Sequence, residues 1–472
     1  MTTVRQERHR TPSLSTVVGP MLDALPTWPL TAMFALYPLW WALGVVDVMW
    51  IVVAGVMVGL LVRQRSVVTV PRAFGLWLLF LVWMAFSVIQ IDSGGRLLAF
   101  SYRALLYLAA GVFFVYVYNG RHRITERWLS GLMTAFWLIT VVGGYLGIVS
   151  PTTVIRTPAS MVMPAGLASN EMIDQMVVRR FSQYNPDLWI PVDPRPSAPF
   201  LYTNNWGNVF SLTLPFVIGY MIHVRHTRRF WLLAAVLPLS LVPAVLTLNR
   251  GMFIGIAVGA LYASVRFLRA GNVRSLVALV VAGLIGSLVI LSPGVQGPLT
   301  QRLEATTSTE DRASLYLQAI EGVKESPFFG FGVPRASETN VDPVGTQGQF
   351  WLVMYSHGIG GVLLFMAWLV VALLVVARSR GPGMLVCSTV VAIAIVESTY
   401  YGLVPNGLPI IMLAAAMGMR EPGLPGPAVR ADRPRGIAGD VEHGAAPDQG
   451  PLPGWHRPER NHAARAERER SW

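Results

Sequence analysis

The chain has 472 residues, of which 53% are hydrophobic and only 13% are charged. A typical soluble domain carries about 25% charged residues, so this composition excludes a water-soluble enzyme or a disordered chain and favours a membrane protein. The net charge of +12 also suits a nucleic-acid-binding protein, and only the distribution of the charges separates the two interpretations.

Apolar stretches long enough to span a bilayer recur along most of the chain. A transmembrane helix needs about 20 mostly apolar residues, and the sequence contains twelve such stretches. They cover residues 28–45, 48–62, 73–91, 97–118, 128–149, 199–222, 231–248, 251–267, 275–292, 349–377, 383–400 and 402–419. The first continues into the second without a small-residue cleavage site, which argues against a signal peptide. The predicted fold is all-α, a polytopic membrane protein with about twelve transmembrane helices.

Arginine is distributed unequally between the two sets of connecting loops. With both termini in the cytoplasm, the cytoplasmic loops hold fourteen arginines, and the short loops on the other side hold two, Arg96 and Arg250. The fourteen are Arg63, Arg65, Arg72, Arg121, Arg123, Arg127, Arg225, Arg228, Arg229, Arg266, Arg269, Arg274, Arg378 and Arg380. This bias predicts a multi-pass protein of the cytoplasmic (inner) membrane with both termini cytoplasmic. Because topology and anionic membrane lipid account for most of the basic residues, we expect no nucleic-acid partner.

Four segments are too polar to span a membrane. Residues 150–198 and 293–348 are predicted extracytoplasmic loops, and their length and aromatic content indicate folded, partly helical structure. Residues 1–26 and 420–472 are predicted cytoplasmic tails, and the composition of the second is typical of disorder. The transmembrane domain then covers residues 27–419.

Cys387 is the single cysteine of the chain. The sequence therefore excludes an intramolecular disulfide and a cysteine-based metal cluster. Since Cys387 lies within an apolar stretch, we expect it to act as a small hydrophobic residue. We predict no metal and no cofactor.

Ionisable residues at membrane depth are costly and are therefore functional candidates. Arg103 lies about two turns into the fourth predicted span. Three roles are compatible with this position: substrate binding, pairing with another residue inside the bundle, or extension of the side chain to the membrane interface. Arg195 is held in proline-rich, extended chain at the start of the sixth span. Asn204 and Asn205 then enter the membrane, where their amides need partners, as substrate ligands or as helix caps and packing groups.

Further polar groups stand at the outer ends of later spans. Asn249 and Arg250 form a tight turn between the seventh and eighth spans. Arg250 is either a functional group or an anchor at the membrane interface. Glu310, Asp311 and Arg312 begin a helix in the second long loop. The two acids suit the positive end of the helix dipole, whereas Arg312 does not and needs another explanation.

The tenth span contributes Gln347 just before its first turn and His357 about three turns in. A lone intramembrane histidine such as His357 is either a structural residue or a substrate contact. Arginines that converge from separate spans on one face indicate an anion, because guanidinium binds phosphate through two parallel hydrogen bonds and keeps its charge. The predicted substrate class is an anionic lipid or a lipid-linked diphosphate.

Taken in order, these segments resemble the O-antigen ligase/polymerase superfamily of bacterial membrane glycosyltransferases. The resemblance covers about residues 195–365, and the number of spans and the large late extracytoplasmic loop are also similar. The motifs are Arg195 with Phe200, Asn204 and Asn205; Leu246-Thr247-Leu248-Asn249-Arg250-Gly251; Arg312 with Pro327 and Gly330-Phe331-Gly332; and Gly358-Ile359-Gly360-Gly361.

One position departs from the family pattern. Counting back from Gly358, the usual histidine and asparagine are replaced by Gln347 and Gly348. Glutamine forms hydrogen bonds but does not accept a proton at neutral pH. Either another group is the base, the acceptor needs little activation, or the reaction is a variant one. His357 lies about 15 Å further along the helix at 1.5 Å per residue and is a poor substitute.

The resemblance implies transfer or polymerisation of a glycan from a polyprenyl-diphosphate carrier onto an acceptor hydroxyl at the outer face of the cytoplasmic membrane, with inversion and without a metal. The expected partners are the lipid-linked glycan donor, a glycan, lipid or protein acceptor, and membrane lipid. Arg195, Arg250 and Arg312 would stabilise the leaving diphosphate. The predicted catalytic residues are Arg250, Arg312, Arg195, Gln347 and Asp311, and the predicted substrate-binding residues are Arg103, Asn204, Asn205, Asn249 and His357.

Other interpretations remain open. Asp193, Glu310 or Asp311 is the candidate base because each lies near these arginines in the sequence. A transporter or flippase of an anionic lipid-linked substrate would show pseudo-symmetry between the halves of the chain and broken helices at the midplane. A receptor or scaffold would not need the interfacial arginines.

Overall fold

The computed structural model describes residues 25–164, 166, 171–183, 194–290, 308–339, 342–379 and 381–420. The two predicted tails lie almost entirely outside the described residues, as do Asp193 and parts of both predicted extracytoplasmic loops. The backbone of Glu310 and Asp311 is described as helical, but their side chains are not described.

Seven helical segments in the described part of the chain are long and apolar enough to cross a membrane. Their ends agree with the predicted spans to within a few residues. They are α3 (Val46–Arg63), the segment Arg72–Gln90 that contains α4 (Gly75–Phe86), α5 (Gly94–Asn119), α6 (Glu126–Val149), α11 (Arg228–Leu246), α12 (Arg250–Arg269) and α16 (Gln349–Arg378). A mostly helical, multi-span membrane protein is thus confirmed, whereas the number of twelve spans stays a prediction.

The other predicted spans correspond to further helices. Four are single helices: α10 (Thr203–His223), α13 (Val273–Ile290), α17 (Pro382–Glu397) and α18 (Gly407–Gly418). Residues 28–45, predicted as one span, form two short helices in place of one continuous helix, α1 (Trp28–Phe34) and α2 (Tyr37–Leu43). Pro38 stands in the first turn of α2, where a missing N–H is tolerated, and it would interrupt a continuous helix.

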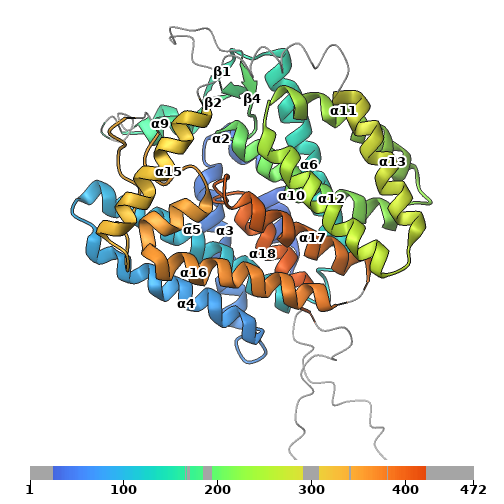
Figure 1. The fold of residues 1–472 in the computed structure, drawn as a ribbon, viewed down its shortest axis with the longest axis horizontal. Helices are drawn as coiled ribbons and strands as arrows, with labels where there is room; N and C mark the ends of the chain where they lie inside the picture. The colour runs from blue at the N-terminus through green and yellow to red at the C-terminus, as the bar shows by residue number, and fades with distance from the viewer. Residues whose placement is uncertain are drawn as a thin grey trace, which may run out of the picture. The chain divides into compact units, whose positions relative to one another are not determined.

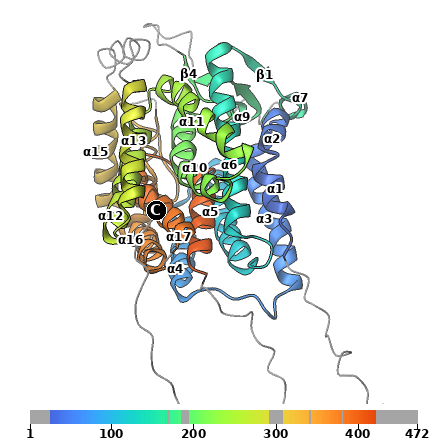
Figure 2. The ribbon, with the colours of Figure 1, turned by 90° about the vertical axis from the view of Figure 1, so that its right-hand side faces the viewer.

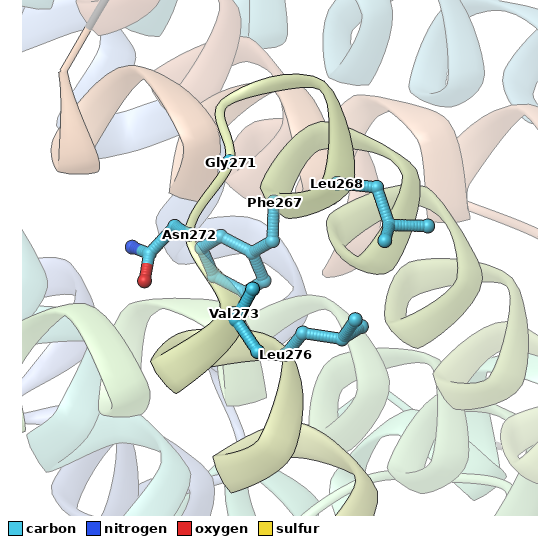
Figure 3. Close-up of a pocket in the computed structure, with 6 residues that line it drawn as sticks. All are labelled: Phe267, Leu268, Gly271, Asn272, Val273 and Leu276. Atoms are coloured by element: carbon cyan, nitrogen blue, oxygen red, sulfur yellow. The ribbon is translucent and has the colours of Figure 1, made fainter.

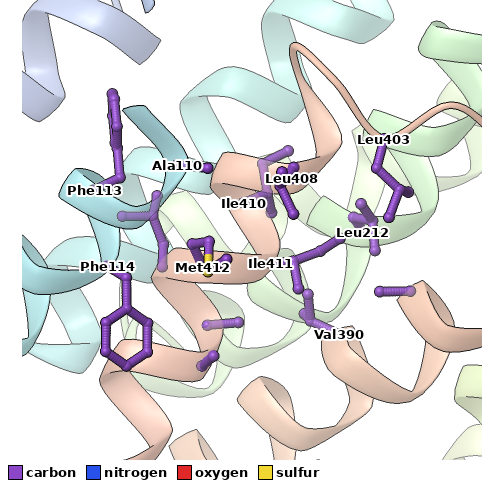
Figure 4. Close-up of a cluster of buried hydrophobic side chains, with 14 of the residues drawn as sticks. Ala110, Phe113, Phe114, Leu212, Val390, Leu403, Leu408, Ile410, Ile411 and Met412 are labelled. Carbon is purple, nitrogen blue, oxygen red and sulfur yellow. The ribbon is translucent and has the colours of Figure 1, made fainter. Parts of the chain in front are cut away.

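Helix α18 is the centre of the core. All of its 12 residues are buried, as expected of a helix that is apolar on every side. Helices α5, α10, α16 and α17 pack against it, and Figure 4 shows Ile411 and Met412 lying near Phe114, Leu212 and Val390. The chain that connects α17 to α18, residues 398–406, is therefore held by the core on both sides.

The first predicted extracytoplasmic loop contains strands as well as helices. Its described elements are β1 (Val154–Arg156), α7 (Pro158–Val162), α9 (Glu171–Val177), β2 (Val178–Arg180), β3 (Ser182–Gln183) and β4 (Arg195–Pro196). Strand β1 pairs antiparallel with β2, and β3 pairs antiparallel with β4. These elements lie together at one end of the helix bundle (Figure 2).

The second predicted loop contributes helix α15 (Ser308–Glu325), which packs against α16 (Figure 1). A small apolar cluster joins α15, α16 and the chain between them. Its buried members are Leu315, Ala319, Phe331, Val344 and Tyr355. The loop is therefore attached to the bundle by its own core, which fixes where Arg312 and Gln347 stand.

Candidate functional site

The turn between α11 and α12 is the first element of the candidate site. Leu248 in this turn has a φ of 53°, a left-handed conformation that is uncommon for a side chain of its size. The next residue, Asn249, is buried; its Nδ2 donates to the Thr203 carbonyl over 2.9 Å, and its Oδ1 accepts a hydrogen bond from the Tyr401 hydroxyl. The turn is thus tied to α10 and to the chain between α17 and α18.

Arg195 reaches the same turn from the first predicted extracytoplasmic loop. It stands in β4, paired with Gln183 of β3, and its Nε donates to the Thr247 carbonyl over 2.8 Å. The Gln183 Oε1 accepts a hydrogen bond of 3.0 Å from the Thr203 hydroxyl. The small strand pair therefore holds Arg195 over the start of α10 and beside the α11–α12 turn.

Arg250 is the first residue of α12, and its side chain is exposed. Directly after it, Gly251 lies so close to Tyr400 and Tyr401 that a Cβ would be 2.6 Å from a ring carbon of Tyr400. The Tyr400 hydroxyl also donates to the Gly251 carbonyl over 3.0 Å. A cation at the positive end of a helix is unfavourable by itself, so this position favours an anion beside Arg250.

Arg312 approaches from the second loop, in the first turns of α15. Tyr316, one turn later, stacks on Trp351 of α16 with ring centroids 4.5 Å apart, and the Trp351 indole donates to the Thr399 carbonyl over 3.0 Å. Arg312 is half-buried and forms no hydrogen bond or ion pair with another described residue.

Tyr401 is the residue on which the charges of Arg195 and Arg312 both act. Burial raises the pKa of the Tyr401 hydroxyl well above its ordinary value, Glu397 and Tyr400 raise it further, and the two arginines act in the opposite direction. The hydroxyl consequently keeps its proton at neutral pH and remains a donor to Asn249.

Three of the predicted residues, from three separate segments, therefore stand near residues 400–401. We call Arg195, Arg250 and Arg312 the arginine site: Arg195 and Arg312 act electrostatically on Tyr401, and Arg250 directly precedes Gly251, which packs against Tyr400 and Tyr401. Two ion pairs are present among the described residues, Arg96 with Asp92 and Arg179 with Asp47, and neither involves the arginine site. The positive charge of Arg250 and Arg312 therefore has no acidic partner in the described part of the chain.

Three further predicted residues, two on α10 and one on α15, are close neighbours in sequence of Thr203 and Arg312. Asn204 and Asn205 are half-buried in the first turn of α10, next to Thr203, and their side chains form no hydrogen bonds with described residues. Asp311 precedes Arg312 on α15, but its side chain lies outside the described residues. Substrate binding by the two asparagines and proton transfer by Asp311 stay predictions.

Gln347 lies at the edge of the arginine site. Its Nε2 donates to Asp342 Oδ2 over 3.0 Å. The next residue, Gly348, lies against the backbone of the chain after α17, where a Cβ would be 2.7 Å from the Thr399 carbonyl carbon. Gln347 is thus held beside an acidic side chain that was not predicted, and its predicted catalytic role stays a prediction.

His357 and Arg103 lie deeper in the bundle. The His357 ring is buried, with Nδ1 3.1 Å from Ser87 Oγ, and it makes edge contacts with Phe80 and Tyr107. Arg103 is half-buried, and its charge acts on Tyr107 and His357. These two residues form a separate group, and their predicted contact with substrate remains untested.

Sequence reasoning missed three buried polar residues next to the arginine site: Gln349, Tyr401 and Glu397. Gln349 donates to the Tyr107 hydroxyl over 2.5 Å and accepts from the Leu403 N–H over 2.9 Å. Glu397 is fully buried at the end of α17 and accepts from Asn208 Nδ2 over 2.7 Å. The sequence does contain a signal for Glu397, because a glutamate inside a predicted span is a functional candidate by default.

A pocket at the other end of α12 has a different character. It lies in the turn from α12 to α13 and is lined mainly by apolar side chains (Figure 3). Its lining residues are Phe267, Leu268, Gly271, Asn272, Val273 and Leu276. It offers no cation for a diphosphate and is not part of the arginine site.

A protein-family model matches a part of the chain that includes two of the three arginines of this site. No curated protein matches the chain significantly. Residues 233–352, which include Arg250, Arg312 and Gln347, match the model of the O-antigen ligase family. The match confirms the resemblance of this chain to the O-antigen ligase/polymerase superfamily and indicates glycan transfer of that general type.

Proposed function

We propose that this protein transfers a glycan from a polyprenyl-diphosphate carrier to an acceptor hydroxyl at the extracytoplasmic face of the cytoplasmic membrane. The observation that carries the proposal is the arginine site itself. Arg195, Arg250 and Arg312 come from distant parts of the sequence. Arg195 and Arg312 act electrostatically on Tyr401, Arg250 precedes the glycine that packs on Tyr400, and Arg250 and Arg312 have no acidic partner among the described residues. A diphosphate at the membrane interface would supply the missing negative charge.

In the proposed reaction, the acceptor oxygen attacks the anomeric carbon of the glycan while the bond from that carbon to the diphosphate breaks. The diphosphate leaves with the bonding electrons and remains on the polyprenyl chain. Attack opposite the leaving group inverts the anomeric centre. Guanidiniums already aimed at the leaving oxygen stabilise its growing charge without reorganisation, which is commonly the largest contribution to catalysis.

The remaining polar residues would hold this arrangement. Asn249 has both ends of its amide engaged, by Thr203 and Tyr401, so we assign it to positioning Arg250. Asn204 and Asn205 have amides free of hydrogen bonds to described residues and would contact the glycan. Arg103, deeper in the bundle, would attract the lipid-linked substrate from the bilayer.

The test is a reconstituted reaction. Purified protein in lipid nanodiscs receives a polyprenyl-diphosphate-linked oligosaccharide labelled in its phosphates, alone or with one of three acceptors: more lipid-linked oligosaccharide, a lipid-anchored saccharide or a protein. We expect free polyprenyl diphosphate and a joined glycan to appear together only with a competent acceptor. In sealed vesicles, translocation of intact donor without its cleavage would instead identify a transporter and refute the proposal.

A further inference from the structure

A tight turn before α16 brings Asp342 and Gln347 together. The Pro343 carbonyl accepts hydrogen bonds from the Thr346 N–H and hydroxyl, over 3.3 and 2.7 Å. Gly345 has a φ of +86°, and a Cβ there would be 2.9 Å from the Tyr355 Cβ. Glycine suits this combination of positive φ and close approach, so the conformation of the turn depends on Gly345.

The turn is anchored at both sides of its bend. Val344 is buried in the apolar cluster with Leu315 and Phe331, and its N–H donates to the Arg335 carbonyl over 2.8 Å. These contacts oppose rotation of the turn away from α15 and α16. The side chains of Asp342 and Gln347, at the two ends of the turn, are therefore held in position relative to each other.

The hydrogen bond from Gln347 leaves the Asp342 carboxylate able to accept a proton. Gln347 Nε2 donates to Oδ2 over 3.0 Å, Asp342 is exposed, and no ion pair with a described residue engages it. A hydrogen bond from an amide orients the carboxylate and leaves Oδ1 able to accept a proton.

The segment that carries Asp342 and Gln347 continues into two residues that contact Thr399 and Tyr401. Gly348 packs on the backbone of Thr399, and the Gln349 N–H donates to the Tyr401 carbonyl over 2.7 Å. Asp342 is paired with none of the site's arginines among the described residues. A carboxylate that is not paired with these arginines remains free to serve the attacking oxygen while the arginines serve the leaving diphosphate.

We infer that Asp342 is the general base of the proposed glycan transfer and that Gln347 is its positioning residue. This inference rests on the proposed function. As the acceptor oxygen bonds to the anomeric carbon, its proton passes to Asp342 Oδ1, and the polyprenyl diphosphate leaves with the electron pair of the broken bond. The resulting carboxylic acid returns its proton to water before the next turnover.

The experiment compares Asp342→Asn with the matched control Glu338→Gln, which alters an exposed acid of the same loop. Transfer is measured in nanodiscs with the labelled lipid-linked oligosaccharide, and binding is measured separately with geranylgeranyl diphosphate. We expect Asp342→Asn to lower kcat by at least about 100-fold, as is usual for loss of a general base, with unchanged diphosphate binding. Glu338→Gln should keep wild-type kcat.

A double variant, Asp342→Asn with Gln347→His, gives the second readout. A histidine in place of Gln347 should restore part of the transfer, with a rate that halves near pH of about 6.5, where wild-type protein still works at its full rate. Wild-type turnover by Asp342→Asn, an equal loss of diphosphate binding, or a double variant with the wild-type pH profile would each overturn the inference. If wild-type protein shows no transfer with any acceptor, the proposed function fails instead.

Discussion

The Tyr401 hydroxyl donates a hydrogen bond to Asn249 Oδ1, although 152 residues separate the two in the sequence. This bond joins the chain between α17 and α18 to the turn that carries Arg250. The bond therefore connects the arginine site to the chain that leads into α18, which is wholly buried.

Replacing Tyr401 with phenylalanine should lower both stability and turnover. The change leaves the buried Asn249 Oδ1 without a donor, which costs about 1–3 kcal/mol, and frees the turn before Arg250. The matched control is Tyr37→Phe, which removes a buried tyrosine–asparagine bond of 2.9 Å to Asn406. We expect similar falls in unfolding temperature but a loss of glycan transfer only for Tyr401→Phe. Equal transfer by the two variants would contradict the role given to this bond.

Removing the Arg250 side chain should abolish most transfer without unfolding the protein. Loss of one preorganised donor to a developing anion commonly costs about 100- to 1,000-fold in kcat, and Arg250 is exposed, so little packing is lost. Arg250→Lys should recover part of the rate, because lysine keeps the charge but not the two-pronged hydrogen bonding.

The control for this series is Arg228→Ala. Arg228 is exposed at the first residue of α11, as Arg250 is at the first residue of α12, but it belongs to the predicted cytoplasmic side. Its replacement should leave labelled diphosphate release unchanged. If Arg250→Ala retains more than half of wild-type turnover, the arginine site does not bind the leaving group as proposed.

Gly255→Ala should destabilise the bundle. Gly255 of α12 lies directly against the fully buried Glu397 carboxylate, and a Cβ there would collide with Glu397 Oε1. Forcing a methyl group into such a packed contact costs about 1–3 kcal/mol. Gly59→Ala in α3 is the control, since nothing lies within 4 Å of a Cβ there. The readout is unfolding temperature in detergent, and equal values for the two variants would refute the close contact.

The predicted orientation can be tested by cysteine labelling. Cys387 is buried and should contribute little background. Arg335→Cys, in the second predicted extracytoplasmic loop, should react with a membrane-impermeant maleimide added outside intact spheroplasts, whereas Arg228→Cys should react only after permeabilisation. The reverse pattern would place the arginine site in the cytoplasm and exclude an extracytoplasmic transferase.

Most helix positions follow from the sequence because burial in lipid or core requires long apolar stretches. The predicted spans at 48–62 and 349–377 match the ends of α3 and α16 closely, although α16 is kinked at Gly358. The break within residues 28–45 has a local cause, Pro38, that averaging of hydropathy conceals. The strands β3 and β4 were missed because two-residue strands have no periodicity and depend on pairing with a distant segment.

The sequence alone determined that this protein belongs in a membrane and that interfacial arginines are its main candidates for function, because apolar length and uncompensated charge are local properties. Only the tertiary structure decided which candidates meet. It placed Arg195 and Arg312 near Tyr401, packed Gly251, the residue after Arg250, against Tyr400, and kept His357 apart in the bundle. Those relationships arise from hydrogen bonds and packing between residues far apart in the chain, which no local pattern encodes.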